Sequence, residues 1–375
     1  MIITVSKEKL KEVIDIVNNI CPKKSDINVL NYFYLEAKNN EVYIMATDLE
    51  INYQTKFPAR IQKEGKILIP AKQFEKIVDN LYEDDVTLET KDDVLFIRGK
   101  KFFLSLPGLS QEDFPTFSTI NKDVYMEIDN EIFSAFLEKL YPILKTSDIR
   151  PEYAGVYFDF LPQGLNLVVT DTIRLGVQKV KPIYYETNFE NGGILLPQRI
   201  IKEYKNIKRK TGKLRIYFEE NQITFEIMNH VLTSKVIAVD YPDYKSYLNP
   251  SSFLFTVLVD KDEVIKALKL SGIYASGDLK ETEIFFDFNE NKLTIYSKNE
   301  LLGEVNNEIG FEPKENNLDN NEFRIRFNLD FLYDGFDAFD SEKILVSFFN
   351  TGEENFPLYL VSPIEDDYVY ISLHL

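Results

Sequence analysis

The sequence predicts an α+β protein built from three repeated domains, each with two helices packed on antiparallel sheets. An alternating apolar strand that breaks into Thr-Asp occurs at 42–50 and again at 165–175, and a fainter copy lies at 292–300. The copies are about 125 residues apart, and the strand-to-helix junctions at Pro70 and Pro197 are offset by about the same length. The many short strands and turns favour antiparallel pairing. Repetition at this period across 375 residues therefore predicts three copies of one domain.

The predicted domains run over 1–122, 123–250 and 251–375. In the first domain, Ser6 is a suitable helix N-cap, and apolar residues follow at helical spacing as far as Ile20. Pro70 marks the start of the second helix. The strands expected in this domain are 2–5, 31–37, 41–46, 51–57, 65–70, 86–90, 94–98 and 101–106.

The second and third domains repeat this order of elements. Their first helices are predicted around 132–140 and from Asp260, where Glu263 completes a pattern like a capping box. Their second helices are predicted around 200–207 and at 329–339. The polar, Asn-rich segment 312–321 is expected to be a surface loop. The main strands expected are 124–128, 192–197, 213–218, 222–228, 231–239, 253–259, 322–327, 343–349, 358–361 and 368–375.

Composition narrows the class of protein. No apolar run reaches the roughly 18–20 residues that a membrane helix needs, and the first residues resemble a strand rather than a signal peptide. Cys21 is the only cysteine, which fits a reducing cytoplasm, where we expect the protein. With two histidines in the chain, a zinc site of the usual Cys/His kind is not expected, nor is any other metal or cofactor.

Charge is unevenly distributed along the chain. The net charge of −18 argues against nucleic-acid binding if it is taken as an average. The segment 199–213 reverses this sign, because it holds seven basic residues and the single acid Glu203. Its apolar residues are expected to point inward, which leaves the cations on the exposed side, either as a solvated face or as a surface for phosphates. The basic residues on or beside helices that we select as DNA contacts are Lys23, Lys24, Lys72, Lys76, Arg150, Arg199, Lys202, Lys205 and Arg209.

No catalytic motif stands out in the sequence. It contains no Gly-rich phosphate loop, no Gly-x-Ser-x-Gly and no His-Glu-x-x-His. Asp48 and Asp171 could act as acids of a hydrolase, but a Thr-Asp pair that ends a strand more often bonds turn amides through the Asp side chain. We therefore expect a protein that is not an enzyme, with a hydrolase as the least favoured alternative.

A second candidate site is apolar. Ile173 and Leu175 flank Arg174 just past a strand end. Pro242 and the C-terminal strand recur in the corresponding register of the repeats. Apolar groups beside one charge suit a peptide-binding groove, although burial in the core explains the same pattern.

Several phrases, taken in order, resemble the bacterial replicative sliding clamps, the beta subunit of DNA polymerase III. No single phrase is specific, but the ordered set covers essentially the whole chain. The phrases are Ala46-Thr47-Asp48-Leu49-Glu50, Ile69-Pro70-Ala71-Lys72, Glu112-Asp113-Phe114-Pro115, Arg150-Pro151 with Gly155-Val156, Thr170-Asp171 with Arg174-Leu175, and Tyr241-Pro242-Asp243-Tyr244.

The resemblance implies the DNA clamp fold and a ring-shaped homodimer, closed head to tail, with helices lining the hole. Double-stranded DNA would thread the ring without sequence specificity, held through diffuse phosphate contacts. The ring would serve as a processivity factor in DNA replication. Its expected partners are the DNA polymerase III catalytic subunit, the clamp loader and other proteins that carry a clamp-binding motif. No membrane partner is expected.

The same resemblance implies a pocket for the partners' peptide. Matched to this chain, its residues are Tyr153, Thr170, Ile173, Arg174, Leu175, Pro242, Tyr247, Tyr370, Ile371, Ser372 and Leu373. The chain departs from the family pattern at Thr172-Ile173, where Gly-His is usual, and at 371–375, where Met-Pro-Met-Arg-Leu is usual. The acids of the last predicted helix and its end, Asp330, Asp334, Asp337 and Asp340, are poorly suited to face DNA. The alternative function is a clamp-like scaffold that binds proteins and is not loaded on DNA.

Overall fold

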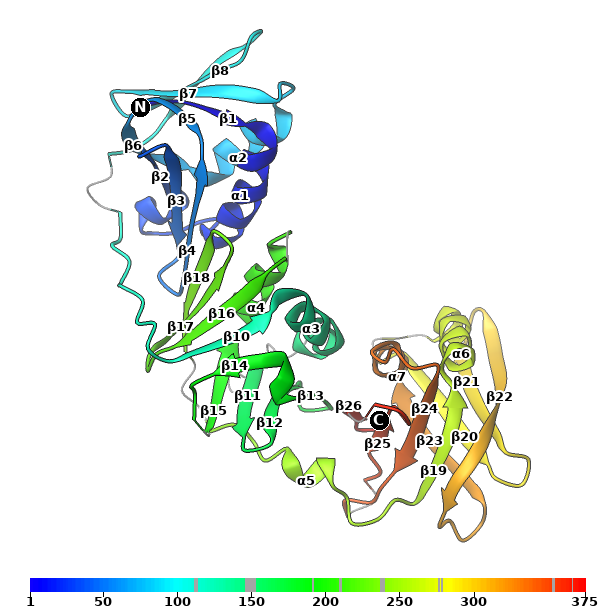
Figure 1. The fold of residues 1–375 in the computed structure, drawn as a ribbon. Coiled ribbons are helices and arrows are strands. Elements are labelled where there is room, and N and C mark those ends of the chain that lie inside the picture. The colour runs from blue at the N-terminus through cyan, green and yellow to red at the C-terminus, as the bar shows by residue number, and fades with distance from the viewer. Residues whose placement is uncertain are drawn as a thin grey trace. The chain divides into compact units, whose positions relative to one another are not determined.

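A computed structural model describes the chain except for residues 111–113, 146–152, 191, 209–210, 237–239, 276, 278, 353–354 and 366. The chain divides into two compact units. Figure 1 shows the helices and strands along the chain. Unit 1 comprises 1–134, 183–190 and 196–237, and unit 2 comprises 135–182, 191–195 and 238–375. This division follows the sheets, because the second repeat contributes strands to two of them.

The described helices and strands follow the predicted order closely. The helices are α1 (Lys7–Ile20), α2 (Ala71–Asn80), α3 (Asn130–Leu144), α4 (Gln198–Asn206), α5 (Lys245–Leu248), α6 (Lys261–Tyr274) and α7 (Leu329–Asp337). A five-stranded sheet has the order β5 (Arg60–Lys63), β1 (Ile2–Ser6), β7 (Asp85–Lys91), β8 (Val94–Arg98) and β9 (Phe103–Pro107). A nine-stranded sheet has the order β14 (Tyr185–Thr187), β10 (Tyr125–Asp129), β16 (Lys213–Phe218), β17 (Gln222–Ile227), β18 (His230–Lys235), β4 (Ile51–Pro58), β3 (Glu41–Thr47), β2 (Tyr32–Lys38) and β6 (Gly65–Pro70).

A twelve-stranded sheet completes the described fold. Its order is β15 (Gly192–Pro197), β11 (Gly155–Leu161), β12 (Gly164–Thr170), β13 (Arg174–Val180), β26 (Tyr368–Ser372), β25 (Leu358–Val361), β24 (Lys343–Phe348), β19 (Phe255–Asp260), β22 (Gly303–Asn316), β21 (Lys292–Asn299), β20 (Glu281–Asp287) and β23 (Glu322–Asn328).

The strand pairings repeat three times along the chain. The first strand of each repeat pairs antiparallel with the strand after its second helix, as β1 with β7, β10 with β16 and β19 with β24. The two strands after the first helix form a hairpin in each case, as β2–β3, β11–β12 and β20–β21. The prediction of repeated α+β domains with antiparallel sheets is confirmed.

Consecutive repeats join through one kind of strand pair. The last strand of the second repeat, β18, pairs with β4, which is the third strand after the first helix of the first repeat. The last strand of the third repeat, β26, pairs in the same way with β13 of the second repeat. The corresponding last strand of the first repeat, β9, is an edge strand in the described chain, paired with β8.

The helix starts agree with the capping residues found in the sequence. Ser6 Oγ accepts a hydrogen bond from the backbone N–H of Lys9 at 3.3 Å, and Asp260 Oδ1 accepts one from Glu263 N–H at 3.1 Å. In unit 1, α1 and α2 lie side by side, and α1 packs on the sheet that contains β3 and β4 (Figure 1). Burial of one apolar side of α1, including Leu10, Ile14 and Val17, holds it on that sheet.

Several boundaries differ from the predictions by a few residues, and two of the differences concern the polar segment of the third repeat and the C-terminal strand. The segment 312–321 is not wholly a loop, because β22 continues to Asn316. This polar strand forms because its first half pairs with β21 and its second half with β19, so the backbone pairing overrides composition. The C-terminal strand ends at Ser372 rather than Leu375.

His230 is a buried histidine in the β18–β4 joint of unit 1. Its Nδ1 lies 2.8 Å from the Tyr53 hydroxyl, and its Nε2 lies 3.6 Å from Glu12 Oε1. Burial, with a smaller contribution from the Lys9 charge, lowers the pKa of His230 to about 4. The ring is therefore neutral in the folded protein at neutral pH.

This pKa predicts acid sensitivity of unit 1. The folded-state pKa lies below the unfolded value near 6.5, so the unfolded state binds more protons between these values and stability falls as pH decreases. We expect His230→Gln to remove about 2 kcal/mol of the stability loss between pH 7.5 and 5, measured by chemical denaturation. The matched control is the half-buried His374→Gln in unit 2; an equal effect of both substitutions would contradict the prediction.

Candidate functional site

The phrases that mark the repeat form the same tight turn between two strands. Asp48 Oδ1 accepts hydrogen bonds from the backbone N–H groups two and three residues ahead, at 3.0 and 2.9 Å. Asp171 Oδ1 makes the same pair at 3.2 and 2.7 Å, and Asn299 Oδ1 in the third repeat makes them at 2.9 and 3.1 Å. These contacts confirm the structural interpretation of Asp48 and Asp171, which the turns use as hydrogen-bond acceptors.

Arg174 follows the second turn and is buried rather than displayed beside the groove. Its side chain is 1% exposed, and its guanidinium lies 2.8 Å from Asp171 Oδ2 and 2.8 Å from Asp334 Oδ2 on α7. The guanidinium also stacks over the Phe331 ring, 4.0 Å from its centroid. The sequence predicts a charged residue at the rim of a peptide groove. Arg174 does border the cavity, but its guanidinium is paired with Asp171 and with Asp334 on α7.

An apolar pocket lies in unit 2 beside this turn, with a cavity of about 200 Å³. Because alternate residues of a strand face opposite sides, Leu175 and Ile371 turn toward the pocket while their neighbours turn away. The pocket is lined by Tyr153, Thr170, Thr172, Ile173, Arg174, Leu175, Tyr241, Pro242, Asp243, Tyr244, Tyr247, Ile371 and Leu373. The structure thus brings together most of the residues predicted for a partner pocket.

Two predicted pocket residues are not in its lining. Tyr370 is buried on the other face of β26, where its hydroxyl donates a hydrogen bond to the Phe331 carbonyl at 2.7 Å. Ser372 is likewise fully buried, and its hydroxyl donates to the Leu373 carbonyl at 3.1 Å. Their assignment to the pocket is wrong because the strand places them two residues apart on the opposite face.

Four lining residues were not predicted: Thr172, Tyr241, Asp243 and Tyr244. Three of them belong to the phrase Tyr241-Pro242-Asp243-Tyr244, from which only Pro242 was assigned to the pocket. The density of aromatic residues in that phrase was the available signal. The Tyr244 hydroxyl donates to Asp159 Oδ2 at 2.6 Å and accepts from Asn166 Nδ2 at 2.9 Å, and burial raises its pKa.

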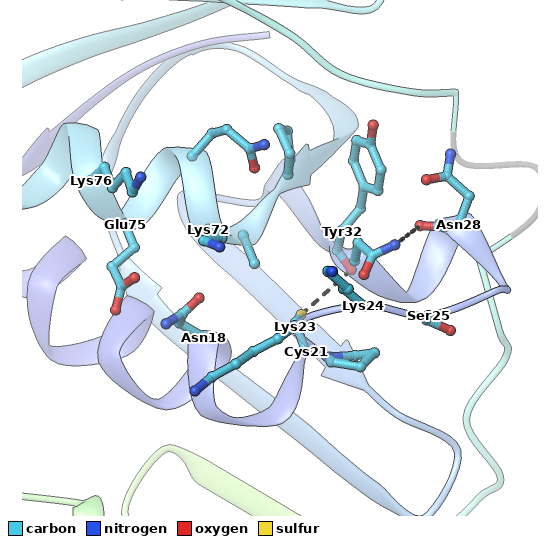
Figure 2. A pocket seen from close by; sticks show the side chains of 15 residues that line it. Asn18, Cys21, Lys23, Lys24, Ser25, Asn28, Tyr32, Lys72, Glu75 and Lys76 are labelled. Atoms are coloured by element: carbon cyan, nitrogen blue, oxygen red, sulfur yellow. Dashed lines mark hydrogen bonds between the residues drawn. The ribbon is translucent and has the colours of Figure 1, made fainter.

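A basic hollow lies in unit 1 between the loop after α1 and the start of α2, with a volume of about 620 Å³. Figure 2 shows lysine side chains from both segments around it. The structure brings together four of the predicted DNA contacts, all with exposed side chains: Lys23, Lys24, Lys72 and Lys76. Glu75 is the acidic residue in the lining, so the hollow keeps a net positive charge. We call it the lysine hollow.

The cations of α4 are arranged differently from the prediction. Arg199 is 41% exposed, but its guanidinium lies 3.1 Å from Asp48 Oδ2 and donates to the Asn19 carbonyl at 3.1 Å. It therefore ties α4 to the first repeat more than it offers a free charge. Lys202 is exposed and Lys205 half-buried. The predicted contacts Arg150 and Arg209 lie outside the described residues.

The acids of α7 and its end are largely paired within unit 2. Asp330 lies 2.8 Å from Lys280, Asp334 lies 2.8 Å from Arg174, and the exposed Asp340 lies 2.9 Å from Lys139. Burial raises the pKa of Asp334, and the Arg174 charge offsets part of that rise. The ion pairs reduce the negative field that the four aspartates would otherwise present.

Two absences concern the described residues. They contain no group of three His, Cys, Asp or Glu side chains placed to hold a metal ion. None of the helices seen in the described ranges has the length and apolar character needed to cross a membrane.

Family comparison accounts for nearly the whole chain. The N-terminal, central and C-terminal domain models of the DNA polymerase III beta subunit match residues 1–118, 127–243 and 247–374, respectively. The chain belongs to the DNA polymerase III beta subunit family. It is a three-domain sliding clamp of that family, as its repeated pairings and ordered motifs predict.

Curated relatives span the chain at low identity. The beta sliding clamp of Helicobacter pylori strain J99 is 25% identical over 387 residues, covering 99% of this chain and 97% of that protein. The beta sliding clamp of Staphylococcus epidermidis strain RP62A is 24% identical over 371 residues, covering 95% and 93%.

Solved structures of sliding clamps share the fold. The beta subunit from Thermotoga maritima superposes with a TM-score of 0.85 at 23% identity, and the Bacillus subtilis clamp with 0.86 at 21%. Each comparison covers 100% of this chain and 99% of the other. At these identities the superpositions show the DNA clamp fold alone.

Proposed function

We propose that the chain forms a ring-shaped homodimer that encircles duplex DNA and tethers the replicative polymerase for processive synthesis. Membership of the beta subunit family is the observation that carries this proposal. The lysine hollow supports it, because exposed cations gather there in a chain whose net charge is −18. We propose further that the clamp has no enzymatic activity, that it works in the cytoplasm and that its domains follow the boundaries 1–122, 123–250 and 251–375.

DNA contact is proposed through phosphates alone. Lys23, Lys24, Lys72 and Lys76 are long, exposed side chains, and a flexible ammonium group binds a phosphate as a point charge without the fixed geometry that reading a base edge requires. Contacts of this kind are individually weak, so a ring can slide while its closure prevents escape.

Removing these charges tests the DNA surface. We expect replacement of Lys23, Lys24, Lys72 and Lys76 by glutamine to weaken duplex binding and to reduce the slope of log K against log salt by roughly one unit for each phosphate that is no longer bound. Binding titrations at several salt concentrations measure both quantities. Glutamine at the strand residues Lys38, Lys56, Lys292 and Lys314 supplies a control of equal charge change; an equal loss of affinity there would remove the hollow from the proposal.

Retention on circular DNA tests the ring itself. A loaded clamp should stay on nicked circular duplex and leave once the circle is cut, because threading rather than affinity holds it. Loss at the same rate from both forms would favour the alternative function, a protein-binding scaffold that is not loaded on DNA.

Ring closure is proposed to use the same strand pair that joins the repeats. In the joints β18–β4 and β26–β13, the last strand of one repeat pairs with a strand of the preceding repeat, namely the third strand after that repeat's first helix. The last strand of the first repeat, β9, is an edge strand in the described chain. The strand of the third repeat that corresponds to β4 and β13 is β22, whose first half pairs with β21. A second copy would complete this series, β9 of each chain pairing with β22 of its partner.

Side chains near these two edges support this closure. Phe103 and Leu104 on β9 are 53% and 38% exposed, and Leu301 and Leu302 just before β22 are 94% and 61% exposed. The β8–β9 turn carries Lys100 and Lys101, whereas the segment from 300 to 308 carries Glu300, Glu304 and Glu308. Apolar contact and opposite charge would both favour heterologous pairing.

We propose that the apolar pocket receives a short peptide of the polymerase, the clamp loader and other partners. Leu175 is expected to anchor it, since this side chain borders the cavity and packs with Val177 and Ile371. Leu175→Ala should weaken binding of a partner-derived peptide by about 1–3 kcal/mol, measured by calorimetry. The exposed Ile183→Ala is the control; unchanged affinity in Leu175→Ala would place the peptide elsewhere.

A further inference from the structure

The Tyr241 hydroxyl is a buried polar group that finds no hydrogen-bond partner among the described residues. Its ring lines the apolar pocket of unit 2. A buried hydroxyl without a partner is unfavourable, because it has given up its bonds to water and gained none in return. Such a group in an otherwise well-packed site calls for a reason.

The neighbouring tyrosine of the same pocket shows the usual arrangement. The Tyr244 hydroxyl donates to Asp159 and accepts from Asn166, so both of its hydrogen-bonding capacities are used. The pocket's Thr170 hydroxyl is also satisfied, since it donates to the Arg174 carbonyl at 2.6 Å. Tyr241 is therefore an exception within its own site.

The orphan hydroxyl is held in place by stacking. The Tyr241 ring lies parallel to Tyr157, with centroids 4.2 Å apart and planes within 1°. The tip of Tyr157 in turn lies against Gly193, where an added Cβ would come within 1.7 Å of the Tyr157 hydroxyl. The glycine leaves room for Tyr157, and the stacking contact with Tyr157 fixes the orientation of the Tyr241 ring.

The cavity indicates what kind of molecule brings the missing partner. A volume of about 200 Å³ is smaller than the roughly 300–1,000 Å³ typical of small-molecule sites, so it suits one or two side chains of a peptide. Its walls include Leu175, Ile371 and Leu373, which favour an apolar side chain. Asp243 in the lining and the strongly acidic chain disfavour a carboxylate there.

We propose that the Tyr241 hydroxyl donates a hydrogen bond to an amide carbonyl of a peptide whose apolar side chain fills this pocket. The proposal rests on the proposed function, in which partners dock here. It assigns Tyr241 the role of a specificity-determining residue: it selects peptides that present a carbonyl, from the backbone or a carboxamide side chain, next to their apolar anchor.

The proposal predicts that removing the Tyr241 hydroxyl oxygen affects the stability of the free protein and the affinity for peptide in opposite directions. Tyr241→Phe removes a hydroxyl that is unpaired in the free protein, so thermal stability should be unchanged or higher. The same change should weaken peptide binding about tenfold, because the peptide carbonyl is then buried without a donor. Tyr244→Phe provides the matched comparison: it strips a donor from Asp159, so the free protein should melt at a lower temperature.

The test uses the full-length clamp and an array of hexapeptides that are acetylated at the N-terminus and amidated at the C-terminus. Each peptide keeps one leucine at a fixed position, and every other position is varied in turn through all amino acids. Wild type, Tyr241→Phe, Tyr244→Phe and Leu175→Asp are compared by bound fluorescence and by melting temperature. Loss in Tyr241→Phe of a preference for Gln or Asn at one position supports a side-chain carbonyl. A uniform loss of about tenfold across all bound peptides supports a backbone carbonyl.

The remaining outcomes separate the two proposals. Peptides that bind wild type and Tyr241→Phe alike, with Leu175→Asp binding none, would overturn the role of Tyr241 and keep the pocket. A lower melting temperature of Tyr241→Phe would likewise overturn it, because the hydroxyl would then have a structural partner. Equal signals from wild type and Leu175→Asp would remove peptide docking itself.

Discussion

Replacing Arg174 by alanine is expected to lower the free energy of unfolding of unit 2 by about 3–5 kcal/mol, because it leaves two carboxylates without their cation. Asp171 and Asp334 have 6% and 20% of their side chains exposed, so solvent compensates them poorly. The substitution also removes the guanidinium from the Phe331 ring. Chemical denaturation followed by tyrosine fluorescence measures the change.

The reason for so large an effect is that Arg174 serves two structures together. Its Nε and one terminal nitrogen bind Asp171, whose other oxygen closes the turn that borders the apolar pocket. Its other terminal nitrogen binds Asp334 on α7. Lysine at this position cannot make the forked contact, so Arg174→Lys should recover only part of the stability.

Two comparisons make this prediction decisive. Lys280→Ala breaks the exposed pair with Asp330 on the same helix, 48% and 52% exposed, and should alter stability by less than about 1 kcal/mol. Arg174→Met combined with Asp334→Leu should recover part of the stability, because one uncompensated charge has gone. Similar free energies of unfolding for Arg174→Ala and Lys280→Ala would show that the buried ion pairs stabilise the protein no more than an exposed pair does.

The elements that were predicted correctly are those whose signal is local. Ser6 and Asp260 are found at helix starts because a side-chain oxygen bonds an N–H three residues ahead, a contact set by neighbouring residues. The Thr-Asp turns are local in the same sense. Strand pairing is different, since β22 is a strand only because β21 and β19 lie beside it.

The candidate site was partly predictable for the same reason. Leu175 and Ile371 do line the pocket, as predicted. Both lie near the ends of strands, next to motifs that the sequence makes visible. The direction of Arg174 depends on Asp334, 160 residues later, which periodicity does not reveal. Tyr370 and Ser372 were assigned by position in a motif, and strand alternation then places them on the other face.

Charge at the ring-closing edges should control the oligomeric state. Leu104→Asp on β9 is expected to convert a dimer, twice the 43.8 kDa of one chain, into monomers at micromolar concentration. An aspartate in an apolar strand interface costs about 3 kcal/mol, which corresponds to more than a hundredfold in the dissociation constant. Light scattering coupled to size exclusion reports the mass, and Ile183→Asp, exposed at 81%, should stay dimeric.

Mixing variants tests how the edges are used. Leu302→Asp damages the β22 side and should also give monomers, because each interface is proposed to need β9 from one chain and β22 from the other. A mixture of the two variants should then form heterodimers, since intact β22 of the Leu104→Asp chain can meet intact β9 of the Leu302→Asp chain. Their second interface holds both aspartates, so the mixed dimer should be weaker than wild type and unable to stay on circular DNA. A symmetric interface between two β9 strands predicts instead that Leu302→Asp alone remains dimeric, and that mixing rescues nothing.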